Sequence, residues 1–108
     1  MSRWLPRVLT RIRELAAARQ VLFTLKARRE LAALAFGLDA EDACDLLVAL
    51  SDKDSAGRLA SATTGEWMYV FTPTVAGVTF YVKLILRAHC VVVSFHEDEG
   101  DGHEEEDA

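Results

Sequence analysis

Residues 77–97 read GVTFYVKLILRAHCVVVSFHE. Two runs of β-branched and aromatic residues are interrupted only at residues 87–90, so this pattern predicts a β-hairpin. With Ala88 and His89 as a two-residue turn, Arg87 faces Cys90. Side chains of a strand alternate between its two faces. One face is therefore expected to be wholly apolar and to lie in the core; it comprises Phe80, Val82, Leu84, Leu86, Val91, Val93 and Phe95.

The other face of the predicted hairpin gathers polar side chains. In this register Lys83 lies opposite Ser94, and Tyr81 lies opposite His96. Directly opposed residues have Cβ atoms about 5 Å apart, so these groups converge on one patch. The full set on this face is Tyr81, Lys83, Ile85, Arg87, Val92, Ser94 and His96. We expect the chemistry of the protein here.

Helical periodicity precedes the strands. Apolar residues recur at helical spacing over residues 6–19, and Asp39 is a good N-cap for a helix that follows it. Residues 21–25 form a short strand candidate, which leads into a further helical segment. After residue 57 the period changes to two, with strands expected at 58–64 and 67–72. This order predicts an α+β domain with N-terminal helices packed on one face of a C-terminal antiparallel β-sheet.

The strand at 67–72 adds side chains to both faces. If Thr72 pairs near Thr79, Met68 and Val70 share the face of the polar patch. Trp67, Tyr69 and Phe71 then join the core.

Basic residues gather at the start of the second helical segment, which contains Lys26, Arg28 and Arg29. Positive charge at a helix N-terminus is locally unfavourable unless an anion lies nearby. The pattern weakly favours a bound phosphate.

Charge is segregated along the chain. The 108 residues carry a formal net charge of −5, yet eight of the 17 acidic residues fall in residues 97–108. Residues 1–96 therefore hold nine acidic against 12 basic residues, a net charge of +3. We expect one domain over 1–96 and a disordered, solubilising acidic tail over 97–108. The alternative is that the tail covers a basic surface when substrate is absent.

Composition also predicts the cellular compartment of the protein. The two cysteines, Cys44 and Cys90, form no CxxC motif, which predicts two reduced, buried thiols. Zinc bound by His89, Cys90 and His96 is a poor alternative, because these ligands would alternate in direction. The basic N-terminal residues form neither a signal peptide nor a membrane span. The expected protein is cytoplasmic, uses no cofactor and does not bind membranes.

Three strings resemble the MqsR family of bacterial toxins, which are mRNA interferases with a RelE-like fold. The strings are FGLDAEDACDLLVALSDKD at 36–54, TTGEWMYVFTP at 63–73 and YVKLILRAHCVVVSFHED at 81–98. The resemblance implies a ribosome-independent endoribonuclease that cuts single-stranded mRNA without metal. It also implies a cognate antitoxin that holds the protein inactive.

The family's catalytic tyrosine corresponds to Tyr81, and the lysine two positions further on corresponds to Lys83. Three positions depart from the family pattern. A lysine in the turn after the third helix is absent, and Arg58 is the nearest cation there. Met68 replaces a glutamine, and His96 replaces a lysine.

RNA cleavage without metal needs attack by the adjacent 2′-hydroxyl, two proton transfers and stabilisation of the charged phosphoryl oxygens. Histidine titrates near about 6.5, whereas tyrosine and lysine titrate near about 10. His96 is therefore the best candidate for proton transfer, while Lys83 and Arg87 suit phosphate binding, with Arg58 assisting. Tyr81 could donate a hydrogen bond to the leaving oxygen or stack on a base.

The predicted site thus comprises catalytic Tyr81, Lys83 and His96, with RNA contacts from Arg58, Met68, Arg87 and Ser94. The alternative is an RNA-binding or antitoxin-binding module on the same scaffold that lacks catalysis.

Overall fold

The α-helices lie in the first half of the chain, and all but one of the strands follow them, as the sequence predicts for an α+β domain. The computed structural model describes residues 2–35 and 37–98. The helices are α1 (Leu5–Ala17), α2 (Leu25–Ala32) and α3 (Ala40–Val48), and a short 3₁₀ helix spans Asp52–Asp54. The strands are β1 (Val21–Phe23), β2 (Ser55–Ala60), β3 (Trp67–Phe71), β4 (Thr74–Val75), β5 (Val78–Leu86) and β6 (Cys90–Glu97).

The sheet is mixed, whereas the sequence led us to expect an antiparallel one. Its strand order is β1-β6-β5-β3-β2, and β4 pairs with β5. All pairs are antiparallel except β1 with β6, which run parallel. The difference arises because β1 follows α1 and joins the edge of a strand that lies about 70 residues later in the chain. A local pattern cannot show such a pairing.

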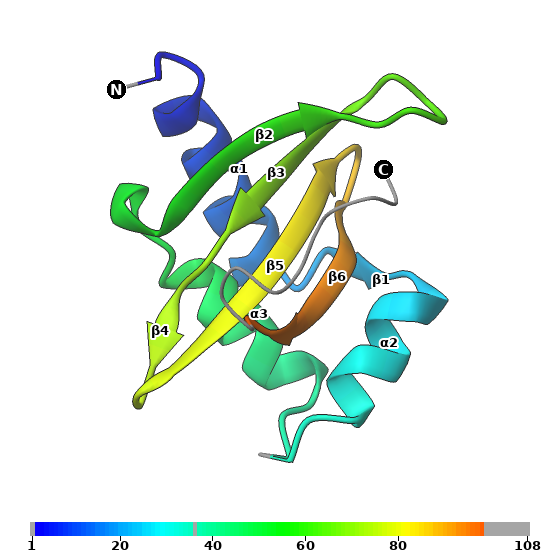
Figure 1. Cartoon of the computed structure of the whole chain (residues 1–108). Coiled ribbons are helices and arrows are strands. Elements are labelled where there is room, and N and C mark those ends of the chain that lie inside the picture. Colours follow the sequence, from blue (N-terminus) through cyan, green and yellow to red (C-terminus); the bar gives the residue numbers. More distant parts are fainter. Residues whose placement is uncertain (1, 36, 99–108) are drawn as a thin grey trace.

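The main core lies between the sheet and the helices. Figure 1 shows α1 and α3 behind the sheet, and α2 beside the edge formed by β1 and β6. Fully buried side chains on the helix side include Ile12, Leu15, Leu47, Phe71, Val82, Leu84 and Phe95. The apolar stripe of α1 supplies Leu5, Val8, Leu9, Ile12, Leu15 and Ala16, as its helical spacing predicts.

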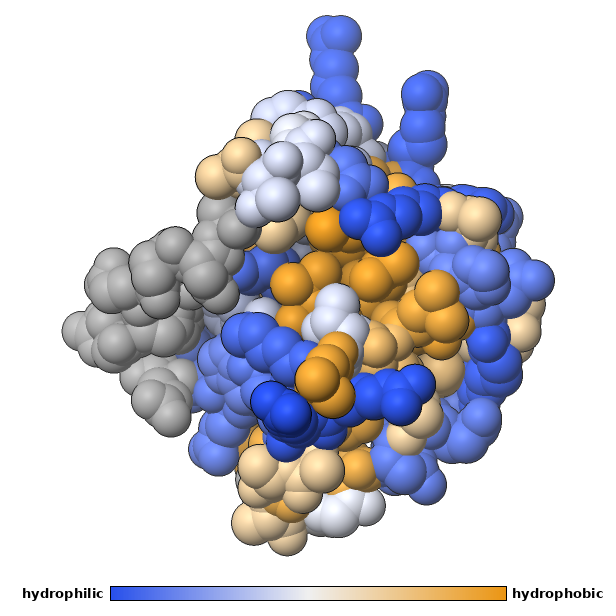
Figure 2. Space-filling model, turned by 90° about the vertical axis from the view of Figure 1, so that its right-hand side faces the viewer, coloured by the Kyte–Doolittle hydropathy of each residue, from blue (hydrophilic) through white to orange (hydrophobic). Residues whose placement is uncertain are grey.

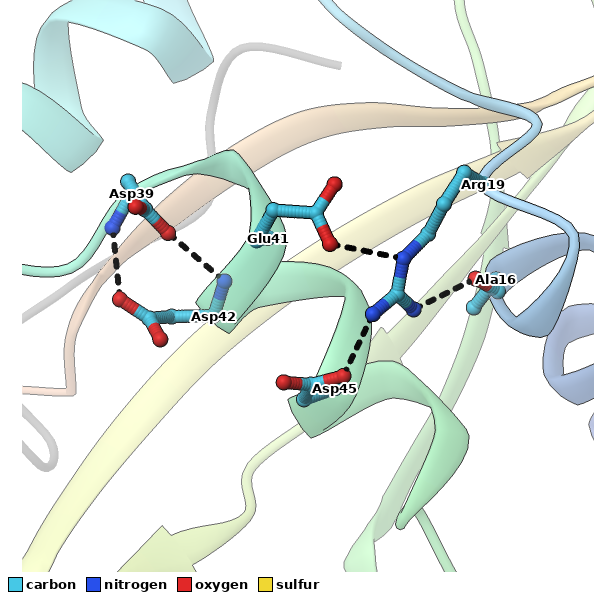
Figure 3. Close-up of polar contacts among 6 residues, drawn as sticks. All are labelled: Ala16, Arg19, Asp39, Glu41, Asp42 and Asp45. Carbon is cyan, nitrogen blue, oxygen red and sulfur yellow. Dashed lines mark hydrogen bonds and ion pairs between the residues drawn. The ribbon is translucent and has the colours of Figure 1, made fainter.

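One arginine joins the end of α1 to α3. The Arg19 guanidinium donates to Asp45 Oδ1 at 2.8 Å and to Glu41 Oε1 at 2.9 Å, and also to the Ala16 carbonyl. Figure 3 shows these contacts together with the capping box of α3. In that box Asp39 and Asp42 each accept a hydrogen bond from the other's backbone N–H. The expected N-cap at Asp39 is confirmed.

The edge of β6 that does not pair with β5 is covered by β1 and by side chains at and after the start of α2. β1 pairs with residues 90–92 of β6. Beyond them the Phe95 N–H donates to Glu30 Oε1 of α2 at 2.8 Å. The Thr24 hydroxyl accepts from Ala27 N–H at the start of α2 and donates to the Val93 carbonyl. These bonds satisfy backbone groups that an open edge would leave to pair with another chain.

The β5–β6 hairpin has a longer loop than the sequence suggested. Leu86 rather than Arg87 pairs with Cys90, so three residues form the loop. The expected pairs Tyr81↔His96 and Lys83↔Ser94 are nevertheless present. One extra residue in β6 forms a bulge between these pairs and the loop, and it compensates for the longer loop. Leu84 pairs with Val92, and Val93 is the extra residue of the bulge.

Because of the bulge, Val91, Val92 and Val93 each lie on the face of the sheet opposite to the expected one. Val92 is fully buried in the helix-side core, where the sequence placed Val91 and Val93. Those two residues lie on the opposite face, beside Met68 and Ile85. Thus the polar end of the hairpin was predicted correctly and the loop end was wrong by one residue.

The β2–β3 region also differs from expectation. β2 begins at Ser55 and ends at Ala60, earlier than the predicted 58–64, and the two-residue strand β4 was not predicted. Phe71 is fully buried and Tyr69 packs against the same core, but Trp67 is 45% exposed. Trp67 is the first residue of β3, and its ring lies against the Arg58 guanidinium.

The side of the molecule that carries α2 and β1 has an apolar area framed by hydrophilic side chains (Figure 2). On these elements Leu22 is 52% exposed and Leu25 is 63% exposed. None of the helices within residues 2–35 and 37–98 is long and apolar enough to span a membrane.

Candidate functional site

The sheet face opposite α1 and α3 carries a polar cluster at the end of the hairpin remote from its loop. We call Lys26, Tyr81, Lys83, Ser94 and His96 the hairpin patch. Four of them are neighbours across β5 and β6, and Lys26 reaches them from α2. The structure therefore brings together all three residues expected to be catalytic, together with Ser94.

Tyr81 and His96 form a stacked pair. Their ring centroids are 5.0 Å apart and their planes differ by 13°. Tyr81 is 4% exposed, whereas His96 is partly exposed. Stacking restrains the orientation of the imidazole ring.

The tautomer of His96 follows from its backbone contact. Nδ1 lies 2.9 Å from the Glu97 carbonyl oxygen. Because a carbonyl oxygen can only accept, Nδ1 must carry the proton in this contact. In the neutral ring Nε2 is then the basic nitrogen, and it is the atom that could take a proton from a hydroxyl group.

Two lysines flank Ser94. Lys83 lies directly opposite Ser94 on β5 and is only 1% exposed. Lys26 Nζ donates to Ser94 Oγ at 2.7 Å and also contacts Glu30 Oε2 at 3.0 Å. The Lys26 side chain is 50% exposed. Lys26 is thus the more accessible cation of the patch.

An apolar cluster continues this face toward the hairpin loop. Met68 is 2% exposed and packs with Ile85 and Val91, with Leu59 and Val93 at its border. Met68 does share the face of Tyr81 and Lys83, as expected. Its burial gives it a packing role, and it offers little surface to an RNA base.

Arg87 lies far from the stacked pair. It follows β5, six residues after Tyr81, which corresponds to roughly 20 Å along a strand. Its guanidinium donates two hydrogen bonds to the Glu66 carboxylate, at 2.7 and 2.9 Å. Arg87 is therefore paired at the other end of the hairpin, and the expectation that it joins the patch was wrong.

Arg58 lies on the opposite face of the sheet. It pairs with Tyr69, whose side chain packs against the helix-side core. Its guanidinium carbon is 3.8 Å from the ring centroid of Trp67 and 5.0 Å from that of Trp4. The sequence placed Arg58 near the catalytic residues because it could not show on which face of β2 this residue lies.

The alternative zinc site is contradicted by geometry. Cys90 is fully buried on the helix side, while His96 lies on the other face and His89 in the exposed loop. Neither cysteine forms a disulfide, and both are buried, as predicted. Desolvation by burial, with a contribution from Cys44, raises the pKa of Cys90 to about 12. Within the described ranges, no group of three or more His, Cys, Asp or Glu residues is arranged to hold a metal ion.

Two residues of this region were absent from the predicted site, Lys26 and Glu30. The basic start of the α2 segment was a signal for Lys26, since it suggested a nearby anion. No local signal showed that α2 lies against β6, because Lys26 and Ser94 are 68 positions apart.

Comparison with known families identifies the class of the protein. The family model that matches residues 7–97 describes the toxin of a toxin–antitoxin pair: "motility quorum-sensing regulator, toxin of MqsA". Because the match spans most of the 108 residues, this chain belongs to the MqsR toxin family, and the resemblance noted in the sequence is confirmed. The family description names an antitoxin, MqsA, as the partner. Comparison with curated proteins gave no match.

Proposed function

We propose that this toxin is an endoribonuclease that cuts mRNA without a metal ion, at the hairpin patch, and that an antitoxin of the MqsA kind neutralises it. The observation that carries the proposal is the stacked Tyr81–His96 pair beside Lys26 and Lys83 on one sheet face. Such a patch combines a proton carrier with cations, which are the groups that phosphodiester cleavage requires.

The proposed reaction begins with the 2′-hydroxyl next to the scissile phosphate. His96 Nε2 removes its proton, and the oxygen attacks phosphorus to form a 2′,3′-cyclic phosphate. The P–O5′ bond breaks, and the leaving oxygen takes a proton from the Tyr81 hydroxyl or from water. Lys26 binds the phosphate of the substrate, and Lys83 stabilises the negative charge that develops on the phosphoryl oxygens. The proton on Nδ1, held toward the Glu97 carbonyl, fixes which nitrogen acts.

Access to the patch is part of the proposal. Tyr81 and Lys83 are 4% and 1% exposed, so a phosphate reaches Lys83 only when the atoms that cover it move. Lys26 and His96 are accessible enough for the first contact. We propose that RNA binds these two residues first.

The test uses a mixed-sequence mRNA in the presence of EDTA, with mapping of the new 5′ ends. We expect discrete cuts that persist in the chelator and fragments ending in 2′,3′-cyclic phosphate. His96→Ala and Tyr81→Phe should each slow cleavage at least about tenfold, the usual minimum for a lost proton-transfer group. Activity equal to wild type in both variants would remove these residues from the mechanism.

A matched control separates catalysis from a general effect of histidine removal. His89 lies in the exposed loop at the other end of the hairpin. The His89→Ala variant should cleave at the wild-type rate, and circular dichroism should show that all three variants are folded.

The burial of Tyr81 and Lys83 favours a second candidate function, a module that binds RNA or the antitoxin without cutting RNA. In the same assay such a protein would retard RNA in a gel and leave it intact. Cleavage that EDTA abolishes would contradict both candidates.

A further inference from the structure

A second cationic surface lies on the other side of the sheet, around the start of α1. It comprises Arg3, Trp4, Arg7, Arg58, Trp67 and Tyr69, which we call the arginine–tryptophan surface. A pocket of about 660 Å³ opens there, and Arg3, Trp4, Arg7, Arg11 and Tyr69 are among its lining residues. Arg58, Trp67 and Tyr69 extend it along β2 and β3.

The aromatic side chains are held in place and remain partly open to solvent. The rings of Trp4 and Tyr69 lie 5.5 Å apart, and the Arg58 guanidinium stacks on both tryptophans. Trp67 is 45% exposed, and Trp4 and Tyr69 are half-buried. An exposed tryptophan held against an arginine is unusual on a surface that binds nothing.

The charges of this surface are poorly compensated. Arg3 and Arg7 form no ion pair with any residue among 2–35 and 37–98, and the nearest carboxylate to Arg11 is Glu14 at 3.8 Å. No acidic residue of the described chain lines the pocket. Guanidinium groups gathered in this way repel one another, and a bound polyanion would relieve the repulsion.

The combination of arginine and aromatic side chains indicates which kind of ligand this surface binds. Arginines bind phosphates, and aromatic rings stack with bases, so grooves that alternate the two kinds of side chain bind single-stranded nucleic acid. An acidic polypeptide would satisfy the arginines but has no flat bases for the tryptophans. RNA therefore fits this surface better.

We propose that the arginine–tryptophan surface binds single-stranded RNA on the flank of the cleavage site and so adds affinity for long substrates. The inference rests on the proposed function for the identity of the ligand. The surface lies on the opposite face from the hairpin patch, and Leu86 in its pocket is five residues along β5 from Tyr81, roughly 17 Å. A short RNA in the patch cannot reach it, whereas a longer one can.

The experiment measures fluorescence anisotropy with full-length protein and 2′-O-methyl RNAs of four and 20 nucleotides, which cannot be cleaved. The main variant is Arg3→Gln/Arg7→Gln, and the control is Lys53→Gln, which removes an exposed lysine of the 3₁₀ helix that belongs to neither cationic surface. Because this RNA cannot be cleaved, its affinity can be measured whether or not the protein is a nuclease. A separate cleavage assay tests the proposed function.

For the 20-mer we expect the main variant to raise Kd at least about tenfold. The salt dependence of log K should become shallower by roughly 1.4, the value for two phosphate contacts on a single strand. Trp67→Leu should raise Kd at least about fivefold through lost stacking. The four-nucleotide RNA should lose less affinity than the 20-mer in the main variant, because it cannot contact the patch and the surface at once. The control variant should bind both RNAs within twofold of wild type.

Three results would overturn the inference. One is wild-type affinity of the main variant for the 20-mer. Another is an equal loss in the control variant, which would mean diffuse electrostatic attraction. The third is a fluorescent polyglutamate peptide that binds through Arg3 and Arg7 as tightly as the 20-mer does, which would assign the surface to an acidic protein.

Discussion

At the residue scale, two contacts of His96 fix the orientation and the tautomer of its imidazole. The ring stacks on Tyr81, and Nδ1 donates to the Glu97 carbonyl. A lysine at position 96 would have no ring to stack on Tyr81. The imidazole is thus held by one ring contact and one backbone contact, on the sheet face where the sequence placed it.

Lys26 provides a prediction about substrate binding. We expect Lys26→Gln to raise KM about fivefold with little change in kcat, because a half-exposed cation contributes about 1 kcal/mol to binding a phosphate. Steady-state cleavage of a fluorogenic RNA measures both constants. Lys53→Gln, which removes an exposed lysine from the 3₁₀ helix, is the control. A loss in kcat alone would assign Lys26 to the chemical step.

The Glu66–Arg87 pair yields a prediction about pH. Hydrogen bonds from Arg87 and then Thr64 lower the pKa of Glu66 from 4.5 to about 2. Since the folded-state pKa is the lower one, the pair stabilises the fold fully above pH 4.5 and loses this effect as the pH falls toward 2. Titration by NMR of the Glu66 carboxyl should show a midpoint near 2 in wild type.

The Arg87→Gln variant should return the pKa of Glu66 toward 4.5, because the largest cause of the shift is removed. Arg28→Gln should leave it unchanged. A wild-type midpoint near 4.5 would show that the ion pair does not persist in solution.

At the element scale, one hydroxyl joins α2 to the bulge of β6. Thr24 Oγ1 accepts from Ala27 N–H at 3.1 Å and donates to the Val93 carbonyl at 3.2 Å. We expect Thr24→Val to lower the free energy of unfolding by about 1–2 kcal/mol, since it loses a helix cap and a second hydrogen bond. Thr24→Ser retains the hydroxyl and should lose less than half as much. Urea denaturation measures both, and equal losses would assign the effect to packing.

Elements that depend on local sequence were predicted correctly. The stripe of α1, the N-cap of α3 and the two long strands of the hairpin each depend on local chemistry, and each was predicted. All four patch residues on β5 and β6 follow from alternation along those strands, once Tyr81 is placed opposite His96. The polar patch was therefore within reach of the sequence.

The failures have physical causes. Residues 91–93 are three consecutive valines, so a one-residue change of register exchanges one valine for another and hydrophobicity cannot reveal it. The parallel pairing of β1, the approach of Lys26 and the face of Arg58 depend on contacts between distant segments. Arg87 seemed suitable because its charge was visible in the sequence, while its partner Glu66 was 21 positions away.

At the scale of the whole molecule, the two cysteines report on the integrity of the core. Burial raises the pKa of both thiols, that of Cys90 to about 12. Because the thiolate is the reactive form, neither should react with DTNB within minutes at pH 8 in the native protein. Two thiols per chain should react at once in 6 M guanidinium chloride. Rapid reaction of one thiol without denaturant would show that the core around that cysteine opens readily.

Cationic groups occupy both faces of the sheet. Lys26 and Lys83 belong to the hairpin patch, whereas Arg3, Arg7 and Arg58 lie on the helix side. These cations belong to residues 1–96, which carry a net charge of +3, although the formal charge of the chain is −5. The acidic residues 99–108, for which we considered a role in covering a basic surface, lie outside the described residues.

The bulge at Val93 bears on how relatives of this toxin should be aligned. Val93 has no partner on β5, so its removal would leave all β5–β6 pairs intact. These pairs run from Phe80↔Glu97 to Lys83↔Ser94 on one side of the bulge and from Leu84↔Val92 to Leu86↔Cys90 on the other. Homologues one residue shorter in this strand are therefore expected, with the gap at position 93. Placing that gap in the hairpin loop instead would shift three cross-strand neighbours and misassign the residues that face the core.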